Sequence, residues 1–107
     1  PTTVHRSAPS GILFVHGIFG SPNEFRPAEA HFRSQGIPCR SISLPAHGER
    51  RLDHRFDQVG LSDLEAAVLD ACGQAHRDWG DFLLVGHSLG GILSLVGASY
   101  APKGLQG

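Results

Sequence analysis

One serine in this sequence stands in a pattern that is typical of nucleophiles in acyl transfer. Residues 86–90 read Gly-His-Ser-Leu-Gly, so Ser88 occupies the centre of a G-x-S-x-G pattern. An apolar run at 82–85 precedes the pattern and a helical pattern follows it, which is the setting that such a serine requires. The sharp turn would hold Ser88 in a strained backbone conformation with its hydroxyl exposed. We therefore predict a nucleophile at Ser88; a turn that only caps a helix is the alternative.

A second glycine-containing segment, His-Gly-Ile-Phe-Gly at residues 16–20, follows the first apolar run of the chain. Acyl transfer needs two hydrogen-bond donors aimed at the oxyanion that develops on the substrate. The backbone N–H of Leu89, at the start of a helix, is one candidate, and the backbone N–H of Ile18 is the other. Because both donors are main-chain groups, both side chains can be apolar. We expect Ile18 and Leu89 to form an oxyanion hole; a plain glycine turn at 16–20 is the alternative.

Three further side chains flank these two segments, and we expect them to line a substrate pocket. They are His16, Phe19 and His87. None of the histidines is a good candidate for the base, because a base must reach the serine oxygen at roughly 2.6–3.2 Å. Adjacent side chains diverge at a sharp turn, which disfavours His87 as the base. His16 and His47 are expected at the same sheet edge as Ser88, where they could line the pocket.

Composition excludes several classes of function. The chain has 107 residues, with Lys+Arg 9 and Asp+Glu 10, and this balance provides no cationic surface for nucleic acid. The sequence has no H-E-x-x-H pattern, no closely spaced cysteine pair, no G-x-G and no Gly-Lys step, so we expect neither a metal nor a cofactor. It also lacks a transmembrane stretch and a signal-peptide layout, so we expect a cytoplasmic protein.

The apolar patterns predict strands that alternate with helices. Alternation of this kind produces right-handed crossovers and a parallel sheet covered by helices. We therefore predict an α/β fold, a three-layer α/β/α arrangement with a mostly parallel sheet. The predicted strands are 12–15, 37–44 and 82–85, and the predicted helices are 21–36, 62–80 and 88–100.

The helices carry start signals and apolar faces. Ser21 with Glu24, and Ser62 with Glu65, each have the spacing of a capping box, in which the two residues satisfy the first N–H groups of a helix. Helical spacing predicts which side chains point inward. These are Phe25, Ala28 and Phe32 in the first helix, Leu61, Leu64, Val68, Cys72 and Ala75 in the second, and Ile92, Leu95, Val96 and Ser99 in the third.

Taken together, the two glycine segments and Leu-Pro-Ala-His-Gly at 44–48 resemble the α/β-hydrolase superfamily, and within it the esterase, lipase and serine-aminopeptidase-like branch. Many members have the sequence L-P-G-H-G in this segment, and this chain has Ala46 in place of the glycine at the third position. The resemblance extends from Ile12 to Pro102. It implies that the 12–15 and 82–85 strands lie side by side, with the 37–44 strand beyond the first. It also implies that Ser88 is the nucleophile and that Ile18 and Leu89 form the oxyanion hole.

The sequence departs from this family after the serine. In the family the triad runs Ser, then Asp or Glu, then His, but residues 89–107 contain no Asp, Glu or His. The later strands are absent as well, so residues 1–107 resemble the N-terminal part of a single hydrolase domain. We expect a serine hydrolase of carboxylic esters with a small ester or acyl substrate, represented without its acid and histidine. The alternatives are a non-catalytic half-fold or interaction module, or a peptidase, thioesterase or lactonase of the same fold.

A sheet of these strands alone would leave the 82–85 strand with an unpaired, apolar edge. Unpaired edges of this kind promote pairing between chains. We therefore expect the 107 residues on their own to self-associate through this edge.

Overall fold

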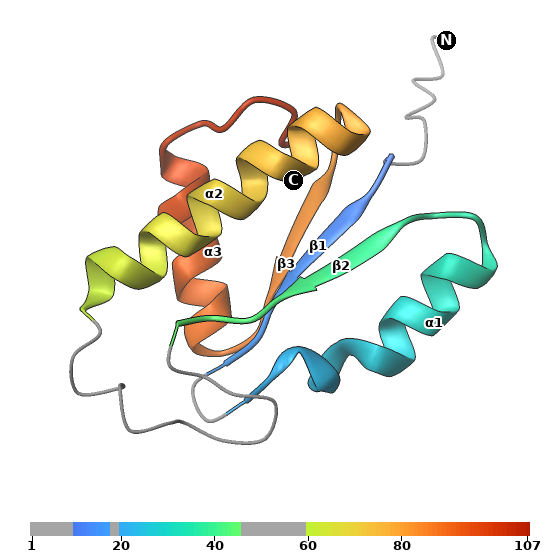
Figure 1. The fold of residues 1–107 in the computed structure, drawn as a ribbon, viewed down its shortest axis with the longest axis horizontal. Helices are drawn as coiled ribbons and strands as arrows, with labels where there is room; N and C mark the ends of the chain where they lie inside the picture. Colours follow the sequence, from blue (N-terminus) through green and yellow to red (C-terminus); the bar gives the residue numbers. More distant parts are fainter. Residues whose placement is uncertain (1–9, 18–19, 46–59) are drawn as a thin grey trace, which may run out of the picture.

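The computed structural model describes residues 10–17, 20–45 and 60–107, and its centre is a three-stranded parallel sheet. The strands are β1 (Ile12–Val15), β2 (Cys39–Ile42) and β3 (Leu83–Gly86), in the order β2-β1-β3 (Figure 1). Ile12 lies opposite Cys39 on one side and opposite Leu83 on the other. The predicted α/β fold and the predicted strand order are both confirmed, although β2 is shorter than the sequence suggested.

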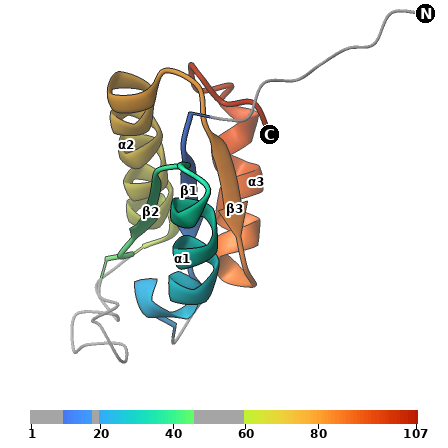
Figure 2. The same ribbon diagram turned by 90° about the vertical axis from the view of Figure 1, so that its right-hand side faces the viewer.

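Helices cover both faces of the sheet (Figures 1 and 2). A short 3-10 helix, η1 (Pro22–Phe25), leads into α1 (Arg26–Ser34) on one face. The helices α2 (Leu61–Trp79) and α3 (Leu89–Ser99) lie together on the other face. Three layers result, as the alternation of strands and helices predicted.

The central position of β1, covered by helices on both faces of the sheet, explains why its sequence is apolar without a break. Leu13 and Val15 belong to the core cluster that contains residues of α2 and α3, whereas Ile12 and Phe14 belong to the cluster on the α1 side. The ring of Phe14 stacks on that of Phe25, with 4.8 Å between centroids. A strand that is covered on both faces needs apolar residues at consecutive positions, so burial on both sides accounts for the run.

The inner faces of two helices differ from the predicted ones in detail. In α2 the predicted positions from Leu64 onward are buried, but Leu61 is 58% exposed because it is the first residue of the helix. In α3 the predicted face is wrong, since Ile92 and Leu95 are 60% and 75% exposed. The buried residues of α3 are Gly90, Leu93, Ser94 and Gly97. Glycine occupies positions 90 and 97 because a Cβ atom there would lie 2.1 Å from the Val15 carbonyl oxygen of β1 and 3.1 Å from Val68 of α2.

The two predicted capping boxes are also corrected. Ser21 does accept a hydrogen bond from the Asn23 N–H at 3.2 Å, but the helix that it begins is η1. At the start of α2, Asp63 rather than Glu65 accepts the N–H of the N-cap residue, Gly60, at 2.9 Å. Glu24 accepts a hydrogen bond from a distant part of the chain, described below.

The outer edge of β3 is partly paired, which corrects the expectation of a fully open edge. The N–H groups of Phe82 and Leu84 donate to the carbonyl oxygens of Gly104 and Gly107, at 2.9 and 2.8 Å. The Gln106 N–H donates to the Phe82 carbonyl at 2.9 Å, and the Phe82–Leu105 bridge is parallel. Residues 104–107 therefore run along the first half of this edge.

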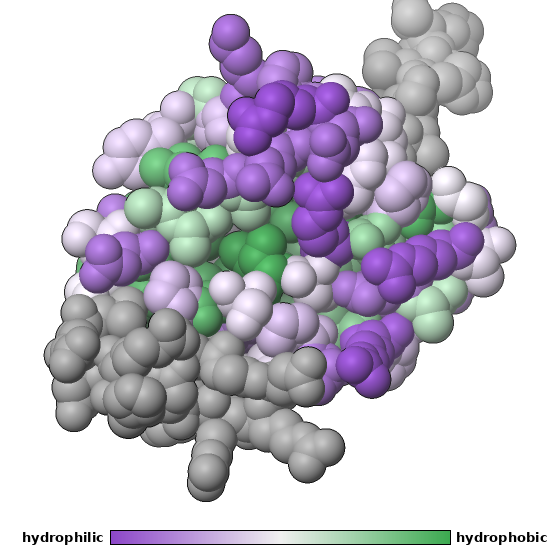
Figure 3. All heavy atoms as spheres, in the orientation of Figure 1, coloured by the Kyte–Doolittle hydropathy of each residue, from purple (hydrophilic) through white to green (hydrophobic). Residues whose placement is uncertain are grey.

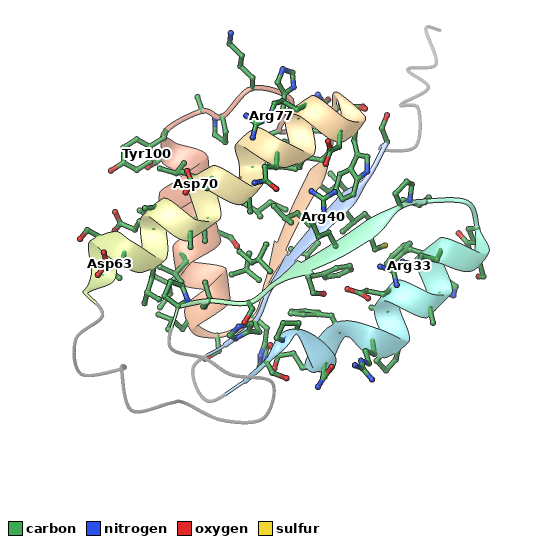
Figure 4. All side chains as sticks on the ribbon, viewed as in Figure 1. Arg33, Arg40, Asp63, Asp70, Arg77 and Tyr100 are labelled. Carbon is green, nitrogen blue, oxygen red and sulfur yellow. The ribbon has the colours of Figure 1, made fainter. Side chains whose placement is uncertain are left out.

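An arginine on β2 connects the sheet to the end of α2 (Figure 4). The Arg40 guanidinium lies 2.8 Å from the Asp78 carboxylate and 4.7 Å from the centroid of the Trp79 ring. Figure 3 shows hydrophobic residues between α2 and α1, with polar side chains over the outer sides of these helices. Among the described residues, no helix is long and apolar enough to cross a bilayer.

Candidate active site

Ser88 occupies the turn that joins β3 to α3. Its backbone has φ 58° and ψ −122°, a region that residues other than glycine rarely adopt, and the residue is exposed. Leu89 is the first residue of α3. Strain at a single exposed serine between a strand and a helix is the geometry of a nucleophile elbow, in which the tight turn holds the serine oxygen clear of the backbone.

The two glycines of the motif are required by the packing of the turn. A Cβ atom on Gly90 would lie 2.1 Å from the carbonyl oxygen of Val15, and one on Gly86 would lie 2.3 Å from the carbonyl oxygen of Gly90. Both distances are far shorter than any real van der Waals contact. Because these neighbours are backbone atoms at the end of β1 and within the turn itself, glycine is the residue that fits at both positions.

The segment that follows β1 lies directly beside the serine. A Cβ atom on Gly17 would be 3.1 Å from the Ser88 Cβ and 3.6 Å from its Oγ. The His87 N–H donates to the carbonyl oxygen of Val15 at 3.2 Å, which joins the two strand ends. The sheet therefore brings together the two glycine segments that the sequence singled out.

The structure locates only one of the two predicted oxyanion donors, Leu89. The N–H of Leu89 belongs to the first turn of α3, where N–H groups have no partner within the helix. Ile18 lies outside the described residues, as do Phe19 and His47, so their predicted positions at the pocket stay predictions. The site as described contains the serine, one candidate donor and the glycine turn.

His16 lies inside the protein and connects two strand ends. It is 0% exposed; its Nε2 accepts the Leu44 N–H at 3.0 Å, and its Nδ1 lies 2.8 Å from the carbonyl oxygen of Gly17. Because Nε2 accepts, Nδ1 carries the proton and donates to that carbonyl. We expected His16 on a pocket wall, but the structure places it beneath the surface, holding Gly17 and Leu44.

His87 has the opposite environment. Its side chain is 72% exposed, and its Nδ1 lies 3.9 Å from the Oε1 of Glu24. The same Oε1 accepts the Gly17 N–H at 2.9 Å. Glu24 is the residue that the sequence reasoning missed, because its spacing from Ser21 fits a capping box equally well and no local pattern indicates a contact with Gly17.

An apolar groove begins at Ser88 and follows β3 and α3. It has a volume of about 490 Å³. The exposed side of α3, with Ile92 and Leu95, forms part of its wall. The other lining residues are Leu84, Gly86, Gly91, Ser94, Ala98, Leu105 and Gly107.

The cysteines are buried thiols rather than reactive ones. Burial raises the pKa of Cys72 to about 11 and also raises the pKa of Cys39. Both therefore stay protonated near neutral pH, and a protonated thiol is a poor nucleophile. Within residues 10–17, 20–45 and 60–107, no three His, Cys, Asp or Glu residues lie close enough to hold a metal ion.

Comparison with known proteins identifies relatives of this chain. A thermostable monoacylglycerol lipase from a Bacillus species is 28% identical over 90% of the chain, and 2-succinyl-6-hydroxy-2,4-cyclohexadiene-1-carboxylate synthase from Klebsiella pneumoniae is 30% identical over 90%. The chain spans only 38% and 35% of the length of these two relatives.

A solved structure and a family model agree with these relatives. An extracellular alpha/beta-hydrolase from a Paenibacillus species superposes with a TM-score of 0.74 at 21% identity, covering 92% of this chain and 38% of that one, which shows the shared fold. The model of the alpha/beta hydrolase family matches residues 12–105. The chain therefore belongs to the alpha/beta hydrolase family.

Proposed function

We propose that this chain carries the nucleophile and oxyanion hole of a serine hydrolase that acts on small carboxylic esters. The observation that supports this most strongly is the backbone of Ser88, which has φ 58° at the junction of β3 and α3. Its ψ of −122° places Ser88 outside the left-handed helical region as well, and residues held in such sparsely populated conformations cluster at active sites. One relative is a monoacylglycerol lipase, and this likeness supports an ester substrate.

In the proposed reaction, the Ser88 oxygen attacks the carbonyl carbon of the ester. A histidine accepts the serine proton and passes it to the departing alcohol, so an acyl-serine remains and water then releases the acid. The N–H groups of Leu89 and Ile18 would donate to the oxyanion of each tetrahedral intermediate. We propose that this histidine and its acid belong to a longer domain of which this chain is the N-terminal part.

A second candidate is a non-catalytic half-fold that serves as an interaction module. It is favoured by the absence of Asp, Glu and His from residues 89–107. A serine without a base is a weak nucleophile, so the two candidates differ in measurable turnover.

Hydrolysis of p-nitrophenyl esters by the full-length protein tests the proposal. Ser88→Ala should lower kcat by about 10⁴-fold or more, as removal of a nucleophile does in other serine hydrolases. Ser99→Ala, at the exposed end of α3, is the matched control and should leave kcat unchanged. Turnover that is absent in the wild type, or equal in wild type and Ser88→Ala, would favour the interaction module.

A further inference from the structure

We propose that Glu24 is a positioning residue that holds the turn after β1 against Ser88. The proposal rests on the proposed function, since it concerns how the oxyanion donors are kept in place. Glu24 belongs to η1, not to either glycine segment. Its carboxylate nevertheless reaches both segments, as the following contacts show.

The Glu24 carboxylate lies against the turn that runs from Gly17 to Gly20. Its Oε1 accepts the Gly17 N–H at 2.9 Å, and a Cβ atom on Gly20 would lie 2.9 Å from Oε2. The turn is closed by the Gly20 N–H, which donates to the carbonyl oxygen of Gly17 at 3.0 Å. The carboxylate therefore contacts both Gly17 and Gly20.

The same carboxylate also faces the serine turn. Oε1 lies 3.9 Å from the Nδ1 of His87, the neighbour of Ser88 in the chain. Gly17 in turn packs against Ser88, with 3.1 Å between a Cβ built on Gly17 and the Ser88 Cβ. Glu24 thus touches the residue on which the serine packs and the residue that precedes the serine.

Glu24 is itself held firmly by its neighbours. The Glu24 N–H donates to the Ser21 carbonyl oxygen at 3.1 Å, and Ser21 is buried. The next residue, Phe25, stacks on Phe14 of β1 with 4.8 Å between ring centroids. The backbone that carries the carboxylate is therefore fixed to the strand whose end it caps, as a positioning role requires.

A charged acceptor makes a stronger hydrogen bond than a neutral one, and it would fix the orientation of the Gly17 peptide group beside Ser88. Donors of an oxyanion hole are effective because they are oriented before the reaction begins. Loss of the carboxylate would leave Gly17 free to move against Ser88 without removing any group that touches the substrate. We therefore expect kcat to change and KM to stay nearly constant.

Three variants of the full-length protein test the proposal with p-nitrophenyl acetate as substrate. Glu24→Ala should lower kcat by about tenfold or more, with KM within about twofold of the wild type. Glu24→Gln should restore kcat to within about threefold, because its amide oxygen still accepts the Gly17 N–H. Asp70→Ala removes an exposed carboxylate of α2 (Figure 4) and should change neither constant.

Amide exchange provides a readout that does not depend on activity. In ¹H–¹⁵N spectra, the Gly17 N–H should exchange with deuterium at least about tenfold faster in Glu24→Ala than in the wild type or in Glu24→Gln, because a buried hydrogen-bonded amide is protected. Equal exchange in all three would overturn the proposal. So would unchanged kcat in Glu24→Ala, a loss confined to KM, or a Glu24→Gln variant as slow as Glu24→Ala.

The two proposals fail in different ways. If the wild type neither hydrolyses esters nor reacts at Ser88, the proposed function is overturned, and the Gly17 amide still decides whether Glu24 holds the turn. If Glu24→Ala does not fold, Glu24→Gln decides, since a loss of kcat or of Gly17 protection in that variant would overturn the proposal.

Discussion

Gly17 and Ser88 are in direct contact, although they belong to different turns of the chain. A Cβ atom on Gly17 would lie 3.1 Å from the Ser88 Cβ and 3.2 Å from the carbonyl oxygen of His87. Parallel pairing of β1 with β3 produces this contact, because the carboxyl ends of the two strands meet at the same sheet edge. An atom added at Gly17 therefore acts directly on the position of Ser88.

Gly17→Ala should impair catalysis more than folding. The added methyl group must displace the serine turn by a few tenths of an ångström, and small displacements of a reacting group are costly, so kcat should fall by about tenfold or more. Kinetics and calorimetry of the full-length protein measure both effects. In the control, Gly73→Ala in α2, the nearest atom to the new Cβ is Arg77 Nη1 at 3.6 Å. That variant should keep its kcat and gain about 0.5–1 kcal/mol of stability; equal kinetics for the two variants would contradict the contact.

Gly90→Ala should destabilise the fold itself. Its Cβ would lie 2.1 Å from the Val15 carbonyl oxygen and 2.4 Å from that of His16, so α3 would have to move away from β1. Overpacking of this kind costs about 1–3 kcal/mol or more. The adjacent Gly91→Ala is a matched control, since its Cβ would come no closer than 3.6 Å to Gly86. Urea unfolding should separate the two variants, and equal midpoints would show that the close approach of α3 to β1 is wrong.

Alkaline pH should weaken the fold through Cys72. Burial raises the pKa of this thiol from 9.0 to about 11 in the folded state, so the folded protein keeps a proton that the unfolded chain loses. The contribution of this thiol to the free energy of unfolding is fully present below pH 9 and is lost as the pH rises toward 11. The free energy of unfolding falls by on the order of 3 kcal/mol at most. Urea unfolding at pH 7 and pH 10 should show a smaller loss in Cys72→Ala than in the wild type. Equal losses in the two proteins would contradict this assignment.

The 107-residue chain should self-associate when it is produced alone. Leu95 and Ile92 are 75% and 60% exposed along the apolar groove, next to the half of the β3 edge that residues 104–107 do not pair. Exposed apolar edges favour pairing with another chain. Analytical ultracentrifugation should show a mass that rises with concentration, and Leu95→Glu should reduce the association. Leu61→Glu, at an equally apolar position outside the groove that is 58% exposed, is the control; a monodisperse wild-type monomer would refute the prediction.

Much of the fold could be predicted because the sequence patterns that indicate its strands and turns lie within short segments. Consecutive apolar residues mark β1 because it is buried on both faces, and the glycines around Ser88 mark a turn that no larger residue could form. The inner face of α3 could not be predicted in this way. Gly90 and Gly97 face inward there because β1 and α2 are so close, and hydrophobic periodicity assigns the inner face to larger residues such as Ile92 and Leu95.

The contacts that escaped prediction are those between segments distant in the sequence. His16 resembles a pocket residue in the sequence, but its ring nitrogens bind the backbone of Leu44 and Gly17. Residues 104–107 have no strand pattern, yet they pair with β3 because its edge offers free N–H groups. Glu24 fits a capping box by spacing, and only the fold shows that its carboxylate reaches Gly17.

Covalent labelling of the full-length protein with a fluorophosphonate, followed by mass spectrometry of its peptides, measures whether Ser88 is an activated nucleophile. An activated serine attacks the phosphorus and expels fluoride, so the account predicts one adduct, on Ser88, that disappears in Ser88→Ala. An adduct on another residue, or labelling that is unchanged in Ser88→Ala, would contradict it.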